Sequence, residues 1–341
     1  MIKNSLLLVI IFSLLNAPSF ASGPGTTSAN FLKIPVGARQ TALGSAFTAV
    51  ADDVNAIYYN PGGLAQLDKT EITFVHNKYF EDISQQWFAG AFPAKIGVFG
   101  VGVNYLSVSK FDAYDNNNTK IDSVSAYDMA VNLSYAKHCR LLDNDSFESF
   151  SYGANLKYLS EKLDTIKSSG FGLDIGVLLK PNISSKMNNL SVAFAVNNVV
   201  SSKVKFINES YKLPLEFKTG IAYKSHPARD YWTTLSLDWN FPRDGQNYIA
   251  AGMENIFYEL FALRVGYNSF GDISEGFNLG FGIRCAKFLN QSVEVDYSFS
   301  NTYDFGNIHK MGILYRFGST VGPSPDMQKE KSEPIPPEKA G

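Results

Sequence analysis

The sequence predicts an all-β protein: a 14-stranded antiparallel transmembrane β-barrel with an N-terminal helical plug, or hatch, in its lumen. Three observations support this fold class. From about residue 70 to residue 318, bulky apolar side chains alternate with small or polar ones, which is the period of a β-strand. Most of these runs are 9–14 residues long, enough for a tilted strand to cross a bilayer. The segment before them, residues 22–69, is the predicted hatch, and its residues 34–67 show helical spacing instead.

Composition and charge exclude several classes of protein. The chain has 341 residues, of which 45% are hydrophobic and 14% aromatic, so it is neither intrinsically disordered nor a collagen-like fibre. Its 30 basic and 32 acidic residues give a net charge of -2, and no nucleic-acid partner is expected. Cys139 and Cys285 form no Cys-x-x-Cys pair, and we expect both to be unbonded and far apart.

Residues 1–21 have the layout of a cleavable secretory signal. Lys3 precedes a ten-residue apolar run, and the small residues Ser19 and Ala21 follow it. The apolar run is too short to span a bilayer, and no later stretch approaches the ~20 apolar residues of a membrane helix. We therefore predict export to the outer membrane, with a buried first helix as the alternative interpretation.

The strand predictions follow from the alternation in the middle of the chain. In one clear example, Phe261, Leu263 and Val265 alternate with Ala262 and Arg264. The predicted strands cover residues 70–80, 85–93, 96–109, 123–136, 150–161, 169–179, 189–200, 213–224, 231–241, 247–258, 260–270, 276–287, 291–300 and 308–318. The barrel domain is therefore predicted to span residues 70–318, followed by a flexible tail of Pro, Lys and Glu over residues 319–341.

A secreted soluble β-sandwich is the alternative to a barrel. Its strands also alternate, but they are typically ~5–6 residues long and hide their bulky faces in one core. The longer strands and the predicted export favour a barrel whose bulky face contacts outer-membrane lipid and whose Gly, Ala, Ser and Asn residues face the lumen. Closure is expected because an unpaired backbone group in hydrocarbon costs several kcal/mol.

Residues 34–67 do not alternate in twos, and we interpret them as the plug. A first helix is predicted from the spacing of Ala42, Leu43, Ala46, Phe47 and Val50. Asp52 or Asp53 is predicted to cap a second short helix through Tyr59, and the segment 61–63, Pro-Gly-Gly, to stop it. A ring of this many strands is wide enough to need filling, so the lumen is the expected place for these helices.

The plug carries a family resemblance. Its motifs are Gly37-Ala38-Arg39, Leu43-Gly44-x-Ala46-Phe47, Ala51-Asp52-Asp53 and Ile57-Tyr58-Tyr59-Asn60-Pro61-Gly62-Gly63-Leu64-Ala65. Together they resemble the amino-terminal signature of the PorV/PorQ group within the FadL-like outer-membrane barrels. The resemblance implies an outer-membrane location, a hatch inside the barrel and one of two functions. PorV-like members attend a type IX secretion machine and its secreted cargo, whereas other FadL-like barrels pass hydrophobic small molecules such as fatty acids.

Two groups of residues are candidate sites. The plug motif is the first, and it is interpreted either as a packed plug or as a ligand site: Gly37, Arg39, Gly44, Phe47, Asp52, Asp53, Tyr58, Asn60, Pro61 and Gly62. Within it we hypothesise that a buried ion pair of Arg39 with Asp52 and Asp53 fixes the plug. The second group comprises the lumen-side charges Arg264, Arg284, Glu294, Asp296, Lys310 and Arg316. Their mixed signs favour mutually satisfied ion pairs over the alternative, a solute path.

No motif indicates catalysis. The four histidines are scattered without metal-ligand spacing, and there is no Gly-x-Ser-x-Gly nucleophile elbow. We therefore expect a non-catalytic barrel of the PorV/PorQ type, without metal or cofactor, that is associated with protein secretion or binds secreted cargo. The alternatives are transport of hydrophobic small molecules and a hydrolase assembled across strands. A transporter of hydrophobic molecules would need an apolar lumen cavity near Phe47 and Tyr58, and a cargo-handling barrel would need a broad outer surface.

Overall fold

We describe the computed structural model of this protein for residues 23, 25–80, 82–139, 147–181, 189–205, 209–228, 230–269, 276–288, 291–302 and 306–319. The predicted secretory signal, residues 1–21, and the predicted tail beyond residue 319 lie outside the described residues. The predicted barrel boundaries at residues 70 and 318 agree with the first wall strand, which begins at Thr70, and the last, which ends at Phe317.

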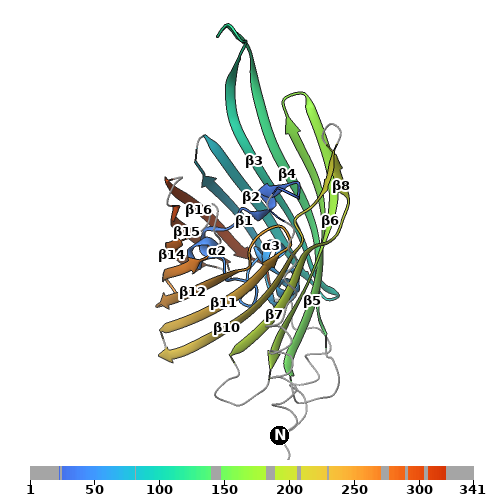
Figure 1. The fold of residues 1–341 in the computed structure, drawn as a ribbon. Coiled ribbons are helices and arrows are strands. Elements are labelled where there is room, and N and C mark those ends of the chain that lie inside the picture. The colour runs from blue at the N-terminus through green and yellow to red at the C-terminus, as the bar shows by residue number, and fades with distance from the viewer. Residues whose placement is uncertain are drawn as a thin grey trace, which may run out of the picture.

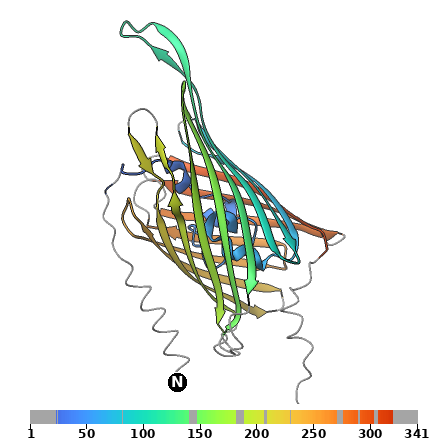
Figure 2. The same cartoon turned by 90° about the vertical axis from the view of Figure 1, so that its right-hand side faces the viewer.

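Fourteen antiparallel strands form one closed barrel, which confirms the predicted fold (Figures 1 and 2). They are β1 Thr70–Lys78, β2 Ile83–Ala94, β3 Gly97–Tyr114, β4 Lys120–Cys139, β5 Phe147–Leu163, β6 Ile166–Pro181, β7 Leu190–Ser201, β10 Glu216–Ala228, β11 Tyr231–Pro242, β12 Tyr248–Phe257, β13 Phe261–Asn268, β14 Gly276–Phe288, β15 Gln291–Thr302 and β16 Gly306–Phe317. Each of these wall strands pairs with the wall strands that come before and after it in the chain, so that β7 pairs with β10. The pairing of β1 with β16 closes the ring.

The outer face of the barrel is apolar, as the alternation predicts. Phe277 of β14 and Leu263 of β13 are 65% and 56% exposed. Arg264, the next residue after Leu263 on β13, is buried on the inside. Large apolar side chains stand outward along most wall strands. A closed sheet with an apolar outer surface fits a lipid environment. The other sheet in the described residues has only two short strands and cannot bury this surface, so the soluble sandwich is ruled out for them.

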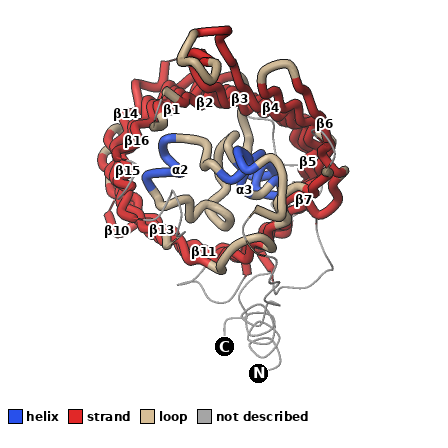
Figure 3. The backbone as a smooth tube through the Cα atoms, turned by 45° about the horizontal axis from the view of Figure 1, so that its top comes forward, coloured by secondary structure: helices blue, strands red, loops and turns tan. Residues whose placement is uncertain are grey.

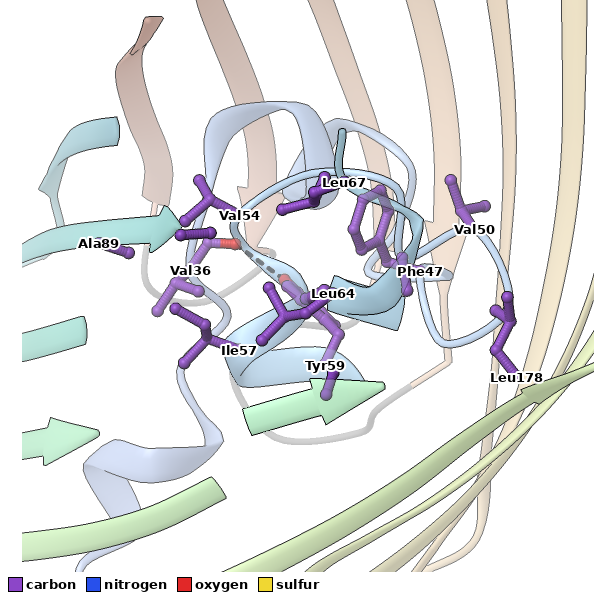
Figure 4. Packing of buried hydrophobic residues seen from close by; sticks show 14 of the residues in the cluster. Val36, Phe47, Val50, Val54, Ile57, Tyr59, Leu64, Leu67, Ala89 and Leu178 are labelled. Atoms are coloured by element: carbon purple, nitrogen blue, oxygen red, sulfur yellow. Dashed lines mark hydrogen bonds between the residues drawn. The ribbon is translucent and has the colours of Figure 1, made fainter. Parts of the chain in front are cut away.

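The plug lies inside the ring, as Figure 3 shows. It comprises α2 Ala38–Ala42, α3 Ala56–Tyr59 and η2 Pro61–Gln66, and η1 Asn30–Lys33 precedes it in the chain. None of the described helices is long and apolar enough to cross a bilayer. The plug core packs Phe47 against Tyr59, whose hydroxyl donates to the Val36 carbonyl over 2.9 Å (Figure 4).

Two predictions within the plug are wrong in detail, and a third, the stop at residues 61–63, is confirmed. The first helix ends at Ala42 rather than continuing to Val50, because Gly44 and Ser45 take left-handed φ angles of 64° and 69°. Asp53 does not cap α3. Instead it accepts a hydrogen bond from the Asn55 amide over 2.8 Å in the turn before the helix. Pro61 ends α3 but begins η2, because the Asn60 side chain accepts from the Gly62 amide.

A small hairpin outside the ring was not predicted. Its strands, β8 Lys203–Lys205 and β9 Ser210–Lys212, pair with each other between β7 and β10. In Figure 2 it lies at the end of the barrel where the β3–β4 hairpin projects, which we call the hairpin end. Thr27 makes a parallel bridge to Lys212, so the start of the described chain lies beside β9. Residues 25–35, which lie beside this hairpin, form what we call the cover.

Candidate functional site: the plug, its seat on the wall and the lumen cavity

Arg39 of α2 is the centre of the contacts between plug and wall. Its buried guanidinium donates to Asp52 over 2.6 Å and to Asp53 over 3.0 Å, so the hypothesised pairing within the plug is present in the structure. The same group donates twice to Glu254 of β12, with both distances 2.8 Å. Glu254 was not among the predicted site residues. The available signal was its place on the inward face of an alternating strand.

Glu254 continues into the predicted lumen charges. It accepts from Arg264 over 2.7 Å, and Arg264 also donates to Glu294 over 3.0 Å and to Asp296 over 2.5 Å. These side chains come from β12, β13 and β15, and all four are buried. Every charge in this group has an opposite charge in contact, an arrangement that braces the wall.

The remaining lumen charges join the same network or hold the plug directly. Arg316 donates to Glu71 over 2.7 Å and to Glu294 over 3.0 Å, and Arg284 lies 3.1 Å from Glu294. Lys310 instead donates to the Pro35 carbonyl over 2.5 Å and to the Thr41 hydroxyl over 2.9 Å. The structure therefore brings five of the six predicted lumen charges into one network and directs the sixth onto the plug.

Further polar contacts fix the plug backbone to other strands. The Thr48 amide donates to Asp238 of β11, and the Val54 amide donates to Glu71 of β1, each over 2.8 Å. Asp52 also pairs with Lys224 of β10 over 2.6 Å. With the bonds from β12 and β16, polar contacts reach the plug from widely separated parts of the ring, which opposes tilting or sliding.

The Asn60-Pro61-Gly62 turn sits against wall glycines. The Asn60 amide group donates to the Val177 carbonyl over 3.1 Å. A Cβ atom on Gly62 would lie 2.6 Å from the Gly176 carbonyl oxygen, and one on Gly153 would lie 2.4 Å from the Pro61 oxygen. These approaches leave no room for a side chain on either surface, so this part of the motif is a packed seat.

Replacement of Trp87 on β2 would measure how much one contact between wall and plug contributes to the free energy of unfolding. Its indole nitrogen donates to the Asn55 side chain over 2.8 Å, and the ring is buried against the plug. Trp87→Phe should lower the free energy of unfolding by about 2 kcal/mol, through the lost hydrogen bond and the smaller ring. Urea titration in detergent micelles would measure this. Trp232→Phe, at a 37% exposed site, is the matched control, and an equal loss there would contradict the assignment.

A cavity lies between the plug and the cover. Its volume is about 50 Å³, room for about three to five water molecules. Tyr58 and Tyr59 line it from the plug, whereas Phe47 belongs to the plug core and does not touch it. The wall contributes mainly carboxamides and ion pairs. The cavity that the structure places beside Tyr58 thus has carboxamides and ion pairs in its lining as well as tyrosine rings, and it does not reach Phe47.

The cavity reaches an irregular part of the wall. Leu173 of β6 pairs with Val200 of β7, but Ile175 pairs with Val196, so three β7 residues bulge opposite one β6 residue. Within the bulge, Asn198 has a φ of 57° and its amide donates to Asp174 over 2.7 Å. Asp174 and Asn198 both line the cavity.

Within the described ranges, no three His, Cys, Asp or Glu side chains are grouped to hold a metal ion. Cys139 on β4 and Cys285 on β14 are both free thiols.

Comparison with known proteins places the fold. The solved structures that resemble this chain include the toluene transporter TodX of Pseudomonas putida, with 10% identity, a TM-score of 0.55 and coverage of 88% of this chain and 98% of that one. The toluene transporter TbuX of Ralstonia pickettii has 10% identity, a TM-score of 0.54 and coverage of 84% and 98%. The CymD monoaromatic hydrocarbon channel has 10% identity, a TM-score of 0.56 and coverage of 83% and 97%. At this identity the likeness is one of fold, and it agrees with the predicted barrel fold.

Sequence comparison identifies the family. A curated "UPF0164 protein" of Treponema pallidum (strain Nichols) is 24% identical over 215 residues, which cover 60% of this chain and 50% of that protein. This chain thus matches about half the length of that relative. The profile described as "Uncharacterised protein family (UPF0164)" matches residues 19–200, more than half of the chain. The chain therefore belongs to the UPF0164 family.

Proposed function

We propose that the protein is a non-catalytic, plugged outer-membrane channel that admits small molecules to its lumen cavity from the hairpin end. The observation that carries this proposal is the cavity itself, enclosed by plug, wall and cover inside a barrel with an apolar exterior. An apolar closed barrel needs a lipid surround, and outer membranes hold barrels of this type. Its fold resembles that of solved hydrocarbon channels, which also supports a channel.

The cover is held by fewer ion pairs than the plug. The Ser28 amide donates to the Lys212 carbonyl over 3.0 Å, and the partly exposed Lys33 pairs with Asp244 over 2.6 Å. The plug, in contrast, is held by a buried network of charges. Solute therefore reaches the cavity first by movement of the cover, and the plug, which closes the far end at rest, must then shift for the solute to pass into the cell.

Uptake by cells tests the proposal. A porin-deficient Gram-negative host expressing the barrel should take up radiolabelled toluene or erythritol at least a few times faster than cells with an empty vector. A cover lock supplies the structural control. Thr27→Cys with Lys212→Cys, at directly bridged positions, should form a disulfide on oxidation in a Cys139→Ser, Cys285→Ser background.

The disulfide lock shows whether uptake depends on movement of the cover. Oxidation should reduce uptake toward the vector level, and reduction should restore it. Uptake of both solutes at the vector level by correctly folded barrel in the outer membrane would contradict the channel function.

A PorV/PorQ-type role in protein secretion is the second candidate. The observation that favours it is the β3–β4 hairpin, which extends past its neighbours at the hairpin end (Figure 1). Phe111 and Tyr114 near its tip are 50% and 55% exposed, as side chains that contact a protein partner would be. Replacing both with Ser should abolish site-specific photocrosslinking from position 112 to secreted cargo or secretion subunits, while leaving solute uptake unchanged. Absence of crosslinks in the unaltered barrel would contradict this role.

A further inference from the structure

Buried carboxamides form a row across the inner face of the first five strands. We call it the amide ladder, and its members are Asn77, Gln85, Asn104, Asn132 and Asn155. Asn77 donates to Gln85 over 3.0 Å, and Gln85 donates to Asn104 over 3.1 Å. Farther round the ring, Asn155 donates to Asn132 over 3.0 Å. Carboxamides in such a row satisfy one another, which is how polar groups are tolerated away from water.

The ladder is interrupted where it meets the cavity. The side-chain nitrogen of Asn104 is buried and has no hydrogen-bond partner. Across the cavity, the side-chain oxygens of Asn197 and Asn198 are also buried without a partner. The three residues that carry this one donor and these two acceptors all line the cavity. Buried polar groups in native proteins are nearly always paired, so these three atoms indicate a ligand that both accepts and donates hydrogen bonds.

The charges in the cavity lining compensate one another. Lys157 pairs with Asp174 over 2.7 Å, and Lys218 pairs with Glu216 over 3.1 Å. Tyr248 also donates to Glu216 over 2.7 Å. With positive and negative groups matched in the described lining, a charged ligand would be desolvated without gaining an opposite charge. A neutral ligand is favoured.

We infer that the cavity is a binding site for a small neutral polyol, of the size of glycerol or erythritol. This inference rests on the proposed channel function and names its solute class. The volume of about 50 Å³ holds about three to five water molecules, so three or four hydroxyl groups suit the space. Each hydroxyl both donates and accepts, as Asn104, Asn197 and Asn198 together require. A hydrocarbon would leave all three amide groups unpaired.

Binding to the full-length barrel in lipid nanodiscs tests the inference. Erythritol, with toluene in a parallel titration, is followed by saturation-transfer-difference NMR and corrected with empty nanodiscs. Erythritol should bind saturably, and Asn104→Leu should weaken its binding by about 3- to 10-fold, the effect of one hydrogen bond. Asn77→Leu is the matched control, because it removes a carboxamide of the same ladder that does not line the cavity.

The outcomes are distinct. Asn197→Ala should also weaken erythritol binding, which keeps the test decisive if Asn104→Leu fails to give the heat-modifiable band of a folded barrel. Saturable binding of toluene alone would overturn the polyol site and leave the channel function standing. Binding of neither solute would overturn the inference, and the cellular uptake assay would then decide the channel function separately. Equal weakening by Asn77→Leu and Asn104→Leu would also overturn it.

Discussion

Arg39→Met is expected to lower the free energy of unfolding by about 3–5 kcal/mol, the loss typical of a broken buried ion pair. Arg39 is 4% exposed and contacts Asp52, Asp53 and Glu254, so its removal leaves buried carboxylates with fewer compensating donors. Urea titration of the barrel in detergent micelles, followed by tryptophan fluorescence, would measure the change. Trp87 contacts Asn55 of the plug and reports its release.

Lys224→Met is the matched control for this prediction. Lys224 pairs with the same Asp52 over 2.6 Å, but its side chain is 44% exposed. An exposed pair contributes about 0–1 kcal/mol, so the control should have a small effect. Equal losses in the two variants would show that the plug is not fixed by the buried charges.

A double-mutant cycle separates pairing from packing. Glu254→Gln removes one partner of Arg39 while Arg264 still donates to the site. If the two groups interact, the loss in Arg39→Met with Glu254→Gln should be smaller than the sum of the single losses by about 0.5–3 kcal/mol. Additive losses would assign the effect of Arg39 to its packing over the Phe47 ring, 5.4 Å from the ring centroid.

The wall could be predicted from the sequence because each strand has one face in lipid and one in the lumen. This contrast leaves a period of two in every wall strand, and all fourteen strands correspond to predicted runs. The β8–β9 hairpin was missed because each of its strands has only three residues, too few to show the period.

The plug was harder to predict because its surroundings are buried on every side. Leu43, Phe47 and Val50 have helical spacing, but all three are buried in turns rather than along one helix face. Helical periodicity identifies a helix only when one face remains in water. Apolar residues enclosed by a barrel have no such constraint, and a left-handed Gly44 could therefore end the helix early.

The wall partners of the plug depend on its rotation within the ring. Glu254 lies 215 positions after Arg39 in the chain, and Asp238 lies 190 positions after Thr48. Alternation places both carboxylates in the lumen, but it does not say which plug residue each one meets. The ion pair within the plug was accessible because Arg39 and Asp52 are 13 positions apart in one short segment.

Gly266→Val is expected to dislodge the plug while the barrel wall stays folded. A Cβ atom on Gly266 would lie 2.0 Å from the Gly44 nitrogen and 2.2 Å from the Leu43 carbonyl carbon. Both obstacles are backbone atoms, and a Cβ atom on Gly44 would itself lie 2.5 Å from the Tyr267 oxygen, so this region cannot yield by side-chain rotation. Overpacking of this kind typically costs about 1–3 kcal/mol, which here falls on the contact between plug and wall.

Conductance in planar bilayers would detect the dislodged plug. The unaltered barrel should show little current because the plug closes the lumen, whereas Gly266→Val should show frequent open steps. Gly245→Val is the control, since a Cβ atom there lies 3.5 Å from its nearest neighbour, Pro242. The wall keeps its own ladder, including the Gly266 pairing with Gly252, so heat-modifiable migration should persist. A folded Gly266→Val barrel with no added conductance would contradict the prediction. The closure of the lumen would then have to be assigned to the cover rather than to the plug.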